Sequence, residues 1–235
     1  MELYTTEQLT ERWEAHNEIC NLVGRFSFYE LLRDTETIKR RLWCEDAEGA
    51  SLGLNDGYYI GIAEIRKYYD AVKASDLCKA AIAKDRHHDV FEGKAADDII
   101  GVGSLMVLNL TTPVLEIAKD MKTAKGLWSF MGGSVEHHAP GGPSAVNRWG
   151  RIGIDFVKES TGWRIWHMIV AVDFEAPMGE NWVMPNIFPE PLIPFTMQRK
   201  NHELYHERRV YTSFPEVPVA YGTFAETFSY GPEDN

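Results

Sequence analysis

The sequence is poor in cysteine and has no long apolar run. Its 235 residues include three cysteines, Cys20, Cys44 and Cys78, and no CxxC pair. An odd number of widely spaced cysteines argues against a disulfide scaffold or a cysteine zinc site, and it suits a reducing compartment. No stretch approaches the roughly 18 apolar residues of a membrane helix, and the N-terminus lacks the basic and apolar regions of a signal peptide. We therefore expect a cytoplasmic protein that does not engage membranes.

Positive charge is also scarce. The formal net charge is -11, and the longest basic runs are residues 39–41 and 208–209. Nucleic-acid binding needs clustered lysines and arginines that neutralise phosphates, so we expect no nucleic-acid partner. The sequence has no GxSxG, no P-loop and no GxGxxG after a predicted strand. Serine hydrolase, nucleotide and nicotinamide functions are therefore without support, and we expect no cofactor.

Helical patterns occupy the first third of the chain. Thr5 and Gln8 form a capping-box pattern, in which the hydroxyl accepts a hydrogen bond from an orphan helix N–H. Asp34 is a suitable N-cap for a second, short helix, and Ile62 lies at the start of a third, with Asp76 as the cap of a continuation. The apolar stripe predicted for the first helix is Leu9, Trp13, His16, Cys20, Val23 and Phe26.

The pattern changes to strands near the middle of the chain. Residues 99–118, 123–136, 148–159 and 162–174 are each rich in β-branched, aromatic and other apolar residues and are separated by turns or loops. Consecutive strands without intervening helices imply an antiparallel sheet, and helices followed by such a sheet define an α+β domain. We assign this domain to residues 1–174.

The last part of the chain is rich in proline. Eight of the 11 prolines follow residue 174, which excludes a helix or a central strand there. The segment is nevertheless rich in large apolar residues, so disorder is not expected. Residues 175–235 are predicted to form an extended arm that packs on the domain or on a neighbouring subunit. We expect a homodimer or a higher homo-oligomer, because an apolar arm needs a surface to cover.

The serial order of several phrases resembles one family. NLVGRFSFYELLRD is followed by IGIAEIRKYYDAV, LTTPVLEI, TAKGLW and DFVKESTGWRIWH. This order resembles the SnoaL-like branch of the NTF2-like superfamily over about residues 8–174. The resemblance implies a cone, in which a strongly curved antiparallel sheet wraps around the N-terminal helices. It also points to polyketide cyclases, scytalone and bile-acid dehydratases and a cofactor-free diarylpropane lyase, although other members only bind a ligand or a protein.

His167 is the first catalytic candidate. Strand alternation places Trp163, Ile165 and His167 on one face. The resemblance implies that the tryptophan of the GWRI phrase faces the cone, so His167 would act there as a general base. Tyr29 could donate a hydrogen bond to a developing oxyanion, and Asp34 could orient His167 or take a proton. Each residue also has a purely structural alternative. His167 could be a core histidine, Tyr29 an aromatic side chain packed on its helix, and Asp34 only an N-cap.

Several other side chains are candidates for substrate binding. Trp128 is in phase with small residues on its strand, which suits a cavity wall that accepts an aromatic substrate, and Phe130 continues that face. Trp149 and Trp43 could also line the cavity, and Asn109 could polarise a carbonyl group. The alternatives are core aromatics and an asparagine that faces solvent.

One literal motif points to zinc. His202, Glu203 and His206 match HExxH, which on a helix presents two zinc ligands and a general base. The surrounding residues are polar and no third ligand is evident, so a zinc hydrolase remains a second alternative.

The leading hypothesis is a cofactor-independent lyase or dehydratase. It would act on a hydrophobic, aromatic, hydroxylated small molecule, by dehydration or by retro-aldol loss of formaldehyde. The first alternative is a non-catalytic module that binds a small molecule or a protein.

Overall fold

The computed structural model describes residues 4–137, 142–181 and 190–232. The elements follow one another in this order: α1 (Thr6–Leu32), α2 (Thr35–Thr37), the π-helical turn η1 (Ile38–Leu42), β1 (Ser51–Leu54), β2 (Gly57–Ile60), α3 (Ile62–Arg86), α4 (His88–Phe91), the 3-10 turn η2 (Asp97–Ile99), β3 (Leu105–Ile117), β4 (Thr123–His137), β5 (Pro143–Glu159), β6 (Gly162–Pro177), β7 (Met197–Gln198) and the 3-10 turn η3 (Phe224–Glu226).

The first helix begins as its sequence predicts. The Thr5 hydroxyl accepts a hydrogen bond from the backbone N–H of Gln8 at 3.2 Å, and the Gln8 side chain accepts one from the N–H of Thr5 at 2.9 Å. The helix ends at Arg33, whose left-handed backbone (φ 58°) redirects the chain. Asp34 then accepts from the N–H of Thr37 at 3.0 Å, so its capping role is confirmed.

The predicted apolar stripe of α1 is wrong at its start. Leu9 is 54% and Trp13 is 66% exposed. The side chain of Arg12 already donates to the carbonyl groups of Ile117, the last residue of β3, and of Ala118 just beyond it, so earlier turns of the helix have little sheet to pack on. The residues that α1 buries lie further along the helix and are Ala15, Ile19, Leu22, Val23 and Phe26.

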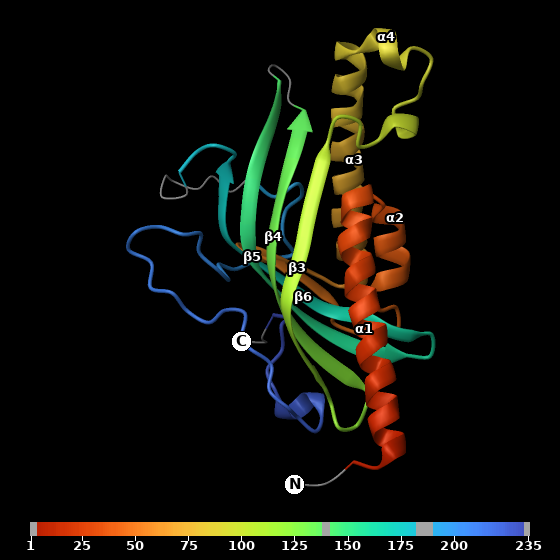
Figure 1. Cartoon of the computed structure of the whole chain (residues 1–235), viewed down its shortest axis with the longest axis vertical. Coiled ribbons are helices and arrows are strands. Elements are labelled where there is room, and N and C mark those ends of the chain that lie inside the picture. The colour runs from red at the N-terminus through yellow and green to blue at the C-terminus, as the bar shows by residue number, and fades with distance from the viewer. Residues whose placement is uncertain (1–3, 138–141, 182–189, 233–235) are drawn as a thin grey trace.

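A curved, mostly antiparallel sheet carries the rest of the domain. Its strand order is β3-β4-β5-β6-β1-β2-β7, with β1 parallel to β6 and the other pairs antiparallel. Helices α1 and α3 lie against one side of the sheet, while the C-terminal segment crosses the other side (Figure 1). The α+β prediction is therefore confirmed. The predicted division at residue 174 falls inside β6, which continues to Pro177.

The third helix is longer than predicted. α3 continues without interruption to Arg86, so the prediction of Asp76 as the cap of a separate helix is wrong. Asp76 is instead 3% exposed in the middle of α3. Its carboxylate lies 3.8 Å from the Arg33 guanidinium and 3.7 Å from the Lys79 ammonium group. Two cations therefore compensate the burial of this acid.

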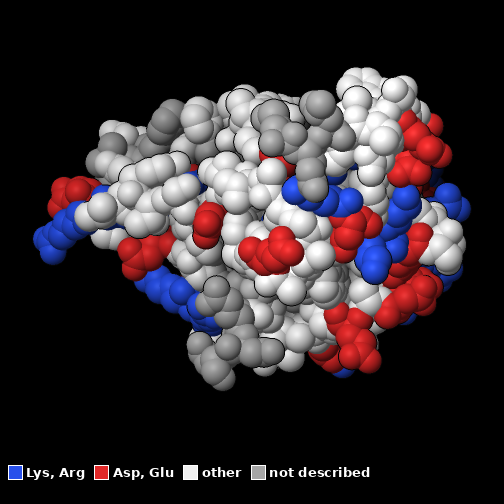
Figure 2. All heavy atoms as spheres, turned by 90° about the horizontal axis from the view of Figure 1, so that it is seen from below, with Lys and Arg blue, Asp and Glu red and all other residues white. Residues whose placement is uncertain are grey.

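Charge on the surface is mixed. On the face drawn in Figure 2, lysines and arginines lie in small groups between acidic side chains. In the described part of the chain, no helix has both the length and the apolar character that a membrane span requires.

A buried ion pair fastens the C-terminal segment to the outer face of the sheet. Lys125 on β4 and Asp155 on β5 are fully buried, with Nζ 2.6 Å from Oδ1. The other carboxylate oxygen of Asp155 accepts from the backbone N–H of Tyr230 at 2.8 Å. The Lys125 ammonium lies 4.3 Å from the ring centre of Phe224 and 4.7 Å from that of Phe228. This part of the C-terminal segment, the tail (residues 224–232), thus supplies a hydrogen bond to the buried carboxylate and aromatic faces to the buried ammonium group.

Burial also affects the acid–base behaviour of Lys125. Burial lowers the pKa of Lys125, and the neighbouring Asp155 carboxylate counters part of that effect. Removal of either partner leaves a buried charge without the ion pair that stabilises it.

Asp155→Ala should therefore destabilise the protein by about 3–5 kcal/mol, measured by chemical denaturation. The matched control is Arg66→Ala, which removes a surface partner 3.1 Å from Glu45. The control should change the free energy of unfolding by less than about 1 kcal/mol. Equal stability of the two variants would contradict the structural role of the buried pair.

Candidate active site

A cavity of about 500 Å³ lies between the inner face of the sheet and the helices α1 and α3. A volume of this size suits a drug-sized organic molecule. Its walls are predominantly apolar and come from helices, strands and the arm. Representative apolar lining residues are Phe26, Leu52, Leu108, Phe130, Ile152 and Val170.

Charged side chains gather on the α1–α3 side of this cavity. Glu30, on the last turn of α1, lines it together with Arg33, Asp76 and Lys79. Arg33 and Lys79 both lie near Asp76, as described above. Arg148 on β5 donates to the Glu175 carboxylate of β6 at 2.6 Å, and both residues also line the cavity. The apolar cavity therefore contains a compact set of acids and bases.

Glu30 is the side chain in this set best suited to proton transfer. Burial raises its pKa to about 7, the nearby Arg33 and Arg148 lower it, and Asp76 raises it further. A carboxyl group with such a pKa can both accept and donate a proton near neutral pH, which is what general acid–base catalysis requires. Burial likewise raises the pKa of Tyr68, so that its phenol stays protonated at the cavity wall as a hydrogen-bond donor.

The prediction that His167 faces the cavity is wrong. Asp155 pairs with His167 but Phe156 pairs with Ile165, so Trp166 is an extra residue that bulges from β6. The bulge resets the alternation of side chains. Ile165 packs in the core under the helices, whereas His167 lies on the outer face, with Nδ1 2.9 Å from Asp155 Oδ2.

Tyr29 and Asp34 also lie outside the cavity lining. Tyr29 packs at the edge of the core, and its backbone carbonyl accepts from the N–H of Asp34 at 2.9 Å. Asp34 is engaged as the N-cap of α2. The structure therefore does not bring the three predicted catalytic side chains together around the cavity.

Of the predicted binding residues, Phe130 lines the cavity. Trp128 fills the core beyond it, edge-on to Phe156 with ring centres 6.1 Å apart. Trp43 is fully buried in the same core. Like these two tryptophans, the other two predicted residues lie outside the cavity lining. Trp149 is 39% exposed on the outer face, with its ring tilted against that of Phe174, and Asn109 is exposed on β3.

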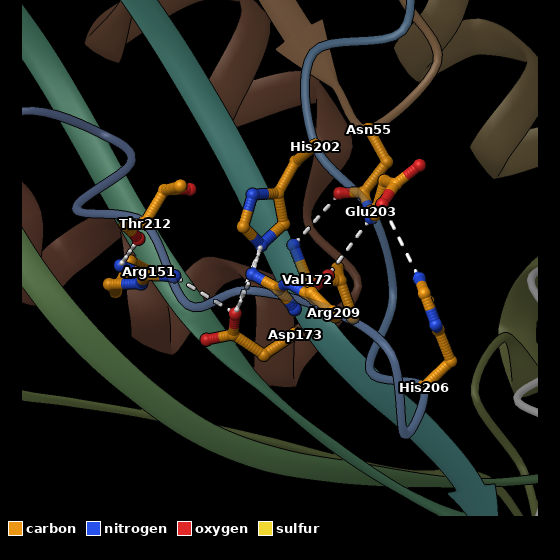
Figure 3. A network of polar contacts seen from close by, with 9 residues as sticks. All are labelled: Asn55, Arg151, Val172, Asp173, His202, Glu203, His206, Arg209 and Thr212. Carbon is orange, nitrogen blue, oxygen red and sulfur yellow. Dashed lines mark hydrogen bonds and ion pairs between the residues drawn. The ribbon is translucent and has the colours of Figure 1, made fainter.

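The HExxH motif does not form a metal centre. Residues 199–206 contain no helix, so the spacing does not bring the two histidines to one face. Figure 3 shows the His202 ring beside Asp173, with Nε2 2.9 Å from Oδ1, and the His206 ring directed away from this group, toward Glu203. Among the residues that the structure describes, no three potential metal ligands gather. The geometry therefore gives the zinc hypothesis no support.

His202 instead belongs to a network that binds the arm to β5 and β6 (Figure 3). Arg151 and Arg209 donate to Asp173 at 2.9 and 3.1 Å. Burial alone would raise the pKa of Asp173, but the hydrogen bond from His202 and the two arginines outweigh it and lower the pKa. This network stabilises the position of the arm and lies on the sheet face opposite the cavity.

Sequence reasoning missed the acidic residues of the site, although a signal was present. Glu30 is four residues after Phe26, and Asp76 is four residues after Val72. These spacings place both acids on buried helix faces. An acid at a core-facing helix position is a recognisable sign of a functional site.

Comparisons with known proteins identify the fold. A hexachlorocyclohexane dehydrochlorinase LinA-type3 from Novosphingobium barchaimii superimposes with a TM-score of 0.50 at 10% identity, over 75% of this chain and 98% of that chain. An NTF2-like superfamily protein from Salmonella enterica gives a TM-score of 0.45 at 16% identity, over 73% and 99%. The protein has the NTF2-like cone fold. No protein-family model and no curated protein matches the chain.

The raised pKa of Glu30 links the stability of the protein to pH. Glu30 binds a proton more tightly in the folded state, with a pKa of about 7, than in the unfolded state, where the value is 4.5. Its contribution to stability is complete below the unfolded pKa and is lost as pH rises through about 7.

Glu30→Gln removes this titration. We expect the stability of the variant relative to the wild type to increase from about pH 5 to about pH 8, measured by urea denaturation at both pH values. Glu14→Gln, an exposed change on the same helix, should show a difference that is independent of pH. A pH-independent difference for Glu30→Gln as well would contradict the raised pKa.

Proposed function

We propose that this NTF2-like protein is a cofactor-independent lyase or dehydratase that acts on a hydrophobic, aromatic, hydroxylated small molecule. The observation that carries the proposal is a carboxyl group with a pKa of about 7 inside a largely apolar cavity of about 500 Å³. Glu30 takes the role of general base that the sequence had suggested for His167. Its surroundings are largely apolar, which strengthens electrostatic interactions with a bound substrate.

The proposed dehydration is a β-elimination. The Glu30 carboxylate removes a proton from the carbon next to the one that bears the hydroxyl group. The electron pair of that C–H bond forms the new double bond, and the C–O bond breaks. The protonated Glu30 carboxyl group then gives its proton to the departing oxygen, so that water leaves and the carboxylate is restored. The guanidinium of Arg33, which is always charged, stabilises the negative charge that develops during this step.

A retro-aldol cleavage would use the same base. Glu30 would then take the proton of a hydroxyl group, and the electron pair left on that oxygen would form the C=O bond of formaldehyde or another carbonyl compound as the carbon–carbon bond breaks. The neighbouring carbon would keep the electron pair of the broken bond and take the proton back from Glu30. The Tyr68 phenol, which lines the cavity and stays protonated, can donate a hydrogen bond to the oxyanion in either reaction. Elimination is also the reaction named in the dehydrochlorinase that shares this fold.

The test is an assay on neutral aryl alcohols and diaryl diols, followed by absorbance of a new conjugated double bond and by release of formaldehyde. We expect kcat/KM to rise with pH, to level off above about pH 7, and to fall by about a hundredfold or more in Glu30→Gln. Glu14→Gln should retain the wild-type rate.

Two results would contradict the proposal. One is turnover that survives Glu30→Gln with an unchanged pH profile, which would remove Glu30 from the chemistry. The other is a small molecule that stays bound to the purified protein and is released intact, without turnover of any substrate tested. That second result would support the alternative of a non-catalytic binding module.

A further inference from the structure

The C-terminal arm forms part of the cavity wall. Glu190, Pro191, Leu192 and Phe195 line the same cavity as Glu30. The two solved structures named above superimpose on 75% and 73% of this chain. The walls of this cavity therefore come from two sources, the cone itself and a segment that follows β6 in the sequence.

The arm is held firmly at this place. The Tyr59 hydroxyl donates to the carbonyl of Ile193 at 2.9 Å, and the ring centres of Tyr59 and Phe195 are 5.0 Å apart. The next residues pair with β2 as strand β7, so that Gly57 lies opposite Gln198. A side chain at position 57 would collide with the Phe195 ring, which means that strand and arm fit closely. Leu192 and Phe195 are thus fixed parts of the wall.

Leu192 is apolar yet 52% exposed where it borders the cavity. An apolar ligand that covers this side chain removes apolar surface from water and gains binding free energy. Phe195 is half-buried beside it and offers a ring face to the same ligand. The arm end of the cavity is therefore suited to an apolar group, and an aromatic ring fits this chemistry best.

Charge at the same cavity selects against anions. The cations that line it face carboxylates of the cavity itself: Arg33 and Lys79 lie beside Asp76, and Arg148 beside Glu175. Two further acids, Asp56 and Glu190, are exposed and line the cavity near the arm. The backbone N–H of Arg199 on the arm donates to the carbonyl of Asp56, which places that acid beside the arm.

We propose that residues 190–195 of the arm, together with Asp56, are the specificity-determining wall of this cavity and select an uncharged ligand with an aromatic group at the arm end. Leu192 and Phe195 contact that group, and the carboxylates of Asp56 and Glu190 repel ligands that carry a carboxylate or sulfonate. The inference rests on the proposed function only in using the same cavity, since it concerns binding and not proton transfer.

The test uses two fluorescent probes with the same ring system. N-phenyl-1-naphthylamine is uncharged, and 8-anilinonaphthalene-1-sulfonate adds one sulfonate. Fluorescence titration should show saturable binding of the uncharged probe and at least about fivefold weaker binding of the anionic probe. Leu192→Ala should weaken the uncharged probe about threefold. Val219→Ala, an exposed apolar change elsewhere on the arm, should leave its affinity unchanged.

A second pair of variants separates local charge from net charge. Asp56→Asn combined with Glu190→Gln should reduce the preference for the uncharged probe. Glu11→Gln combined with Glu14→Gln removes the same number of acids from the exposed side of α1 and should leave the preference unchanged. Equal effects of the two double variants would overturn the charge selection, and equal effects of Leu192→Ala and Val219→Ala would overturn the role of the arm.

The outcome is separable from that of the enzymatic proposal. Glu30→Gln should still bind the uncharged probe, because the substitution leaves the arm wall intact. Probe binding that depends on Leu192, without any turnover, would support the specificity wall and count against the lyase. Turnover that depends on Glu30, with probe affinity indifferent to Leu192, would support the lyase and overturn the wall. Absence of uncharged-probe binding would contradict the proposed wall directly.

Discussion

The extra residue that β6 inserts at Trp166 decides which side chains face the cavity. An ordinary alternation would carry Ile165 and His167 to the same face. The bulge shifts the alternation of side chains along β6 by one residue. Met168 and Val170 therefore line the cavity instead. His167 is sent outward to Asp155, where the C-terminal tail covers it. The inner face of β6 thereby becomes apolar along most of the cavity, and Glu30 reaches the cavity from α1.

This separation gives the two faces of the sheet different roles. On the outer face, Asp155 and Asp173 each accept hydrogen bonds from several partners, including residues of the tail and the arm. Their charges are compensated, and they hold the C-terminal segment in place. On the inner face, Glu30 keeps a raised pKa because its surroundings are apolar and the nearby cations compensate it only in part. The charges that are fully paired stabilise the structure. The Glu30 carboxyl group, whose charge is compensated only in part, is available for proton transfer.

How far the sequence predicts this arrangement depends on the range of the interactions. The cap at Thr5, the cap at Asp34 and the four long strands follow from local patterns, and the structure confirms them. The start of the first of these strands was predicted too early, since β3 begins at Leu105 and not at Ile99. The face of His167 could not be predicted, because the bulge depends on contacts between β5, β6 and a tail that is distant in sequence. The position of Leu192 at the cavity was hidden for the same reason. The position of Glu30 could have been predicted from the sequence, since Glu30 continues the helical spacing from Phe26.

The central claim is that one carboxyl group in the cavity titrates near neutral pH. It can be tested by an NMR pH titration of protein labelled with carbon-13 at the side-chain carboxyl carbon of glutamate. The account predicts one resonance that titrates near pH 7, is lost in Glu30→Gln and shifts when an uncharged aromatic ligand is added. Glutamate resonances that all titrate near their ordinary value of about 4.3 would contradict the account.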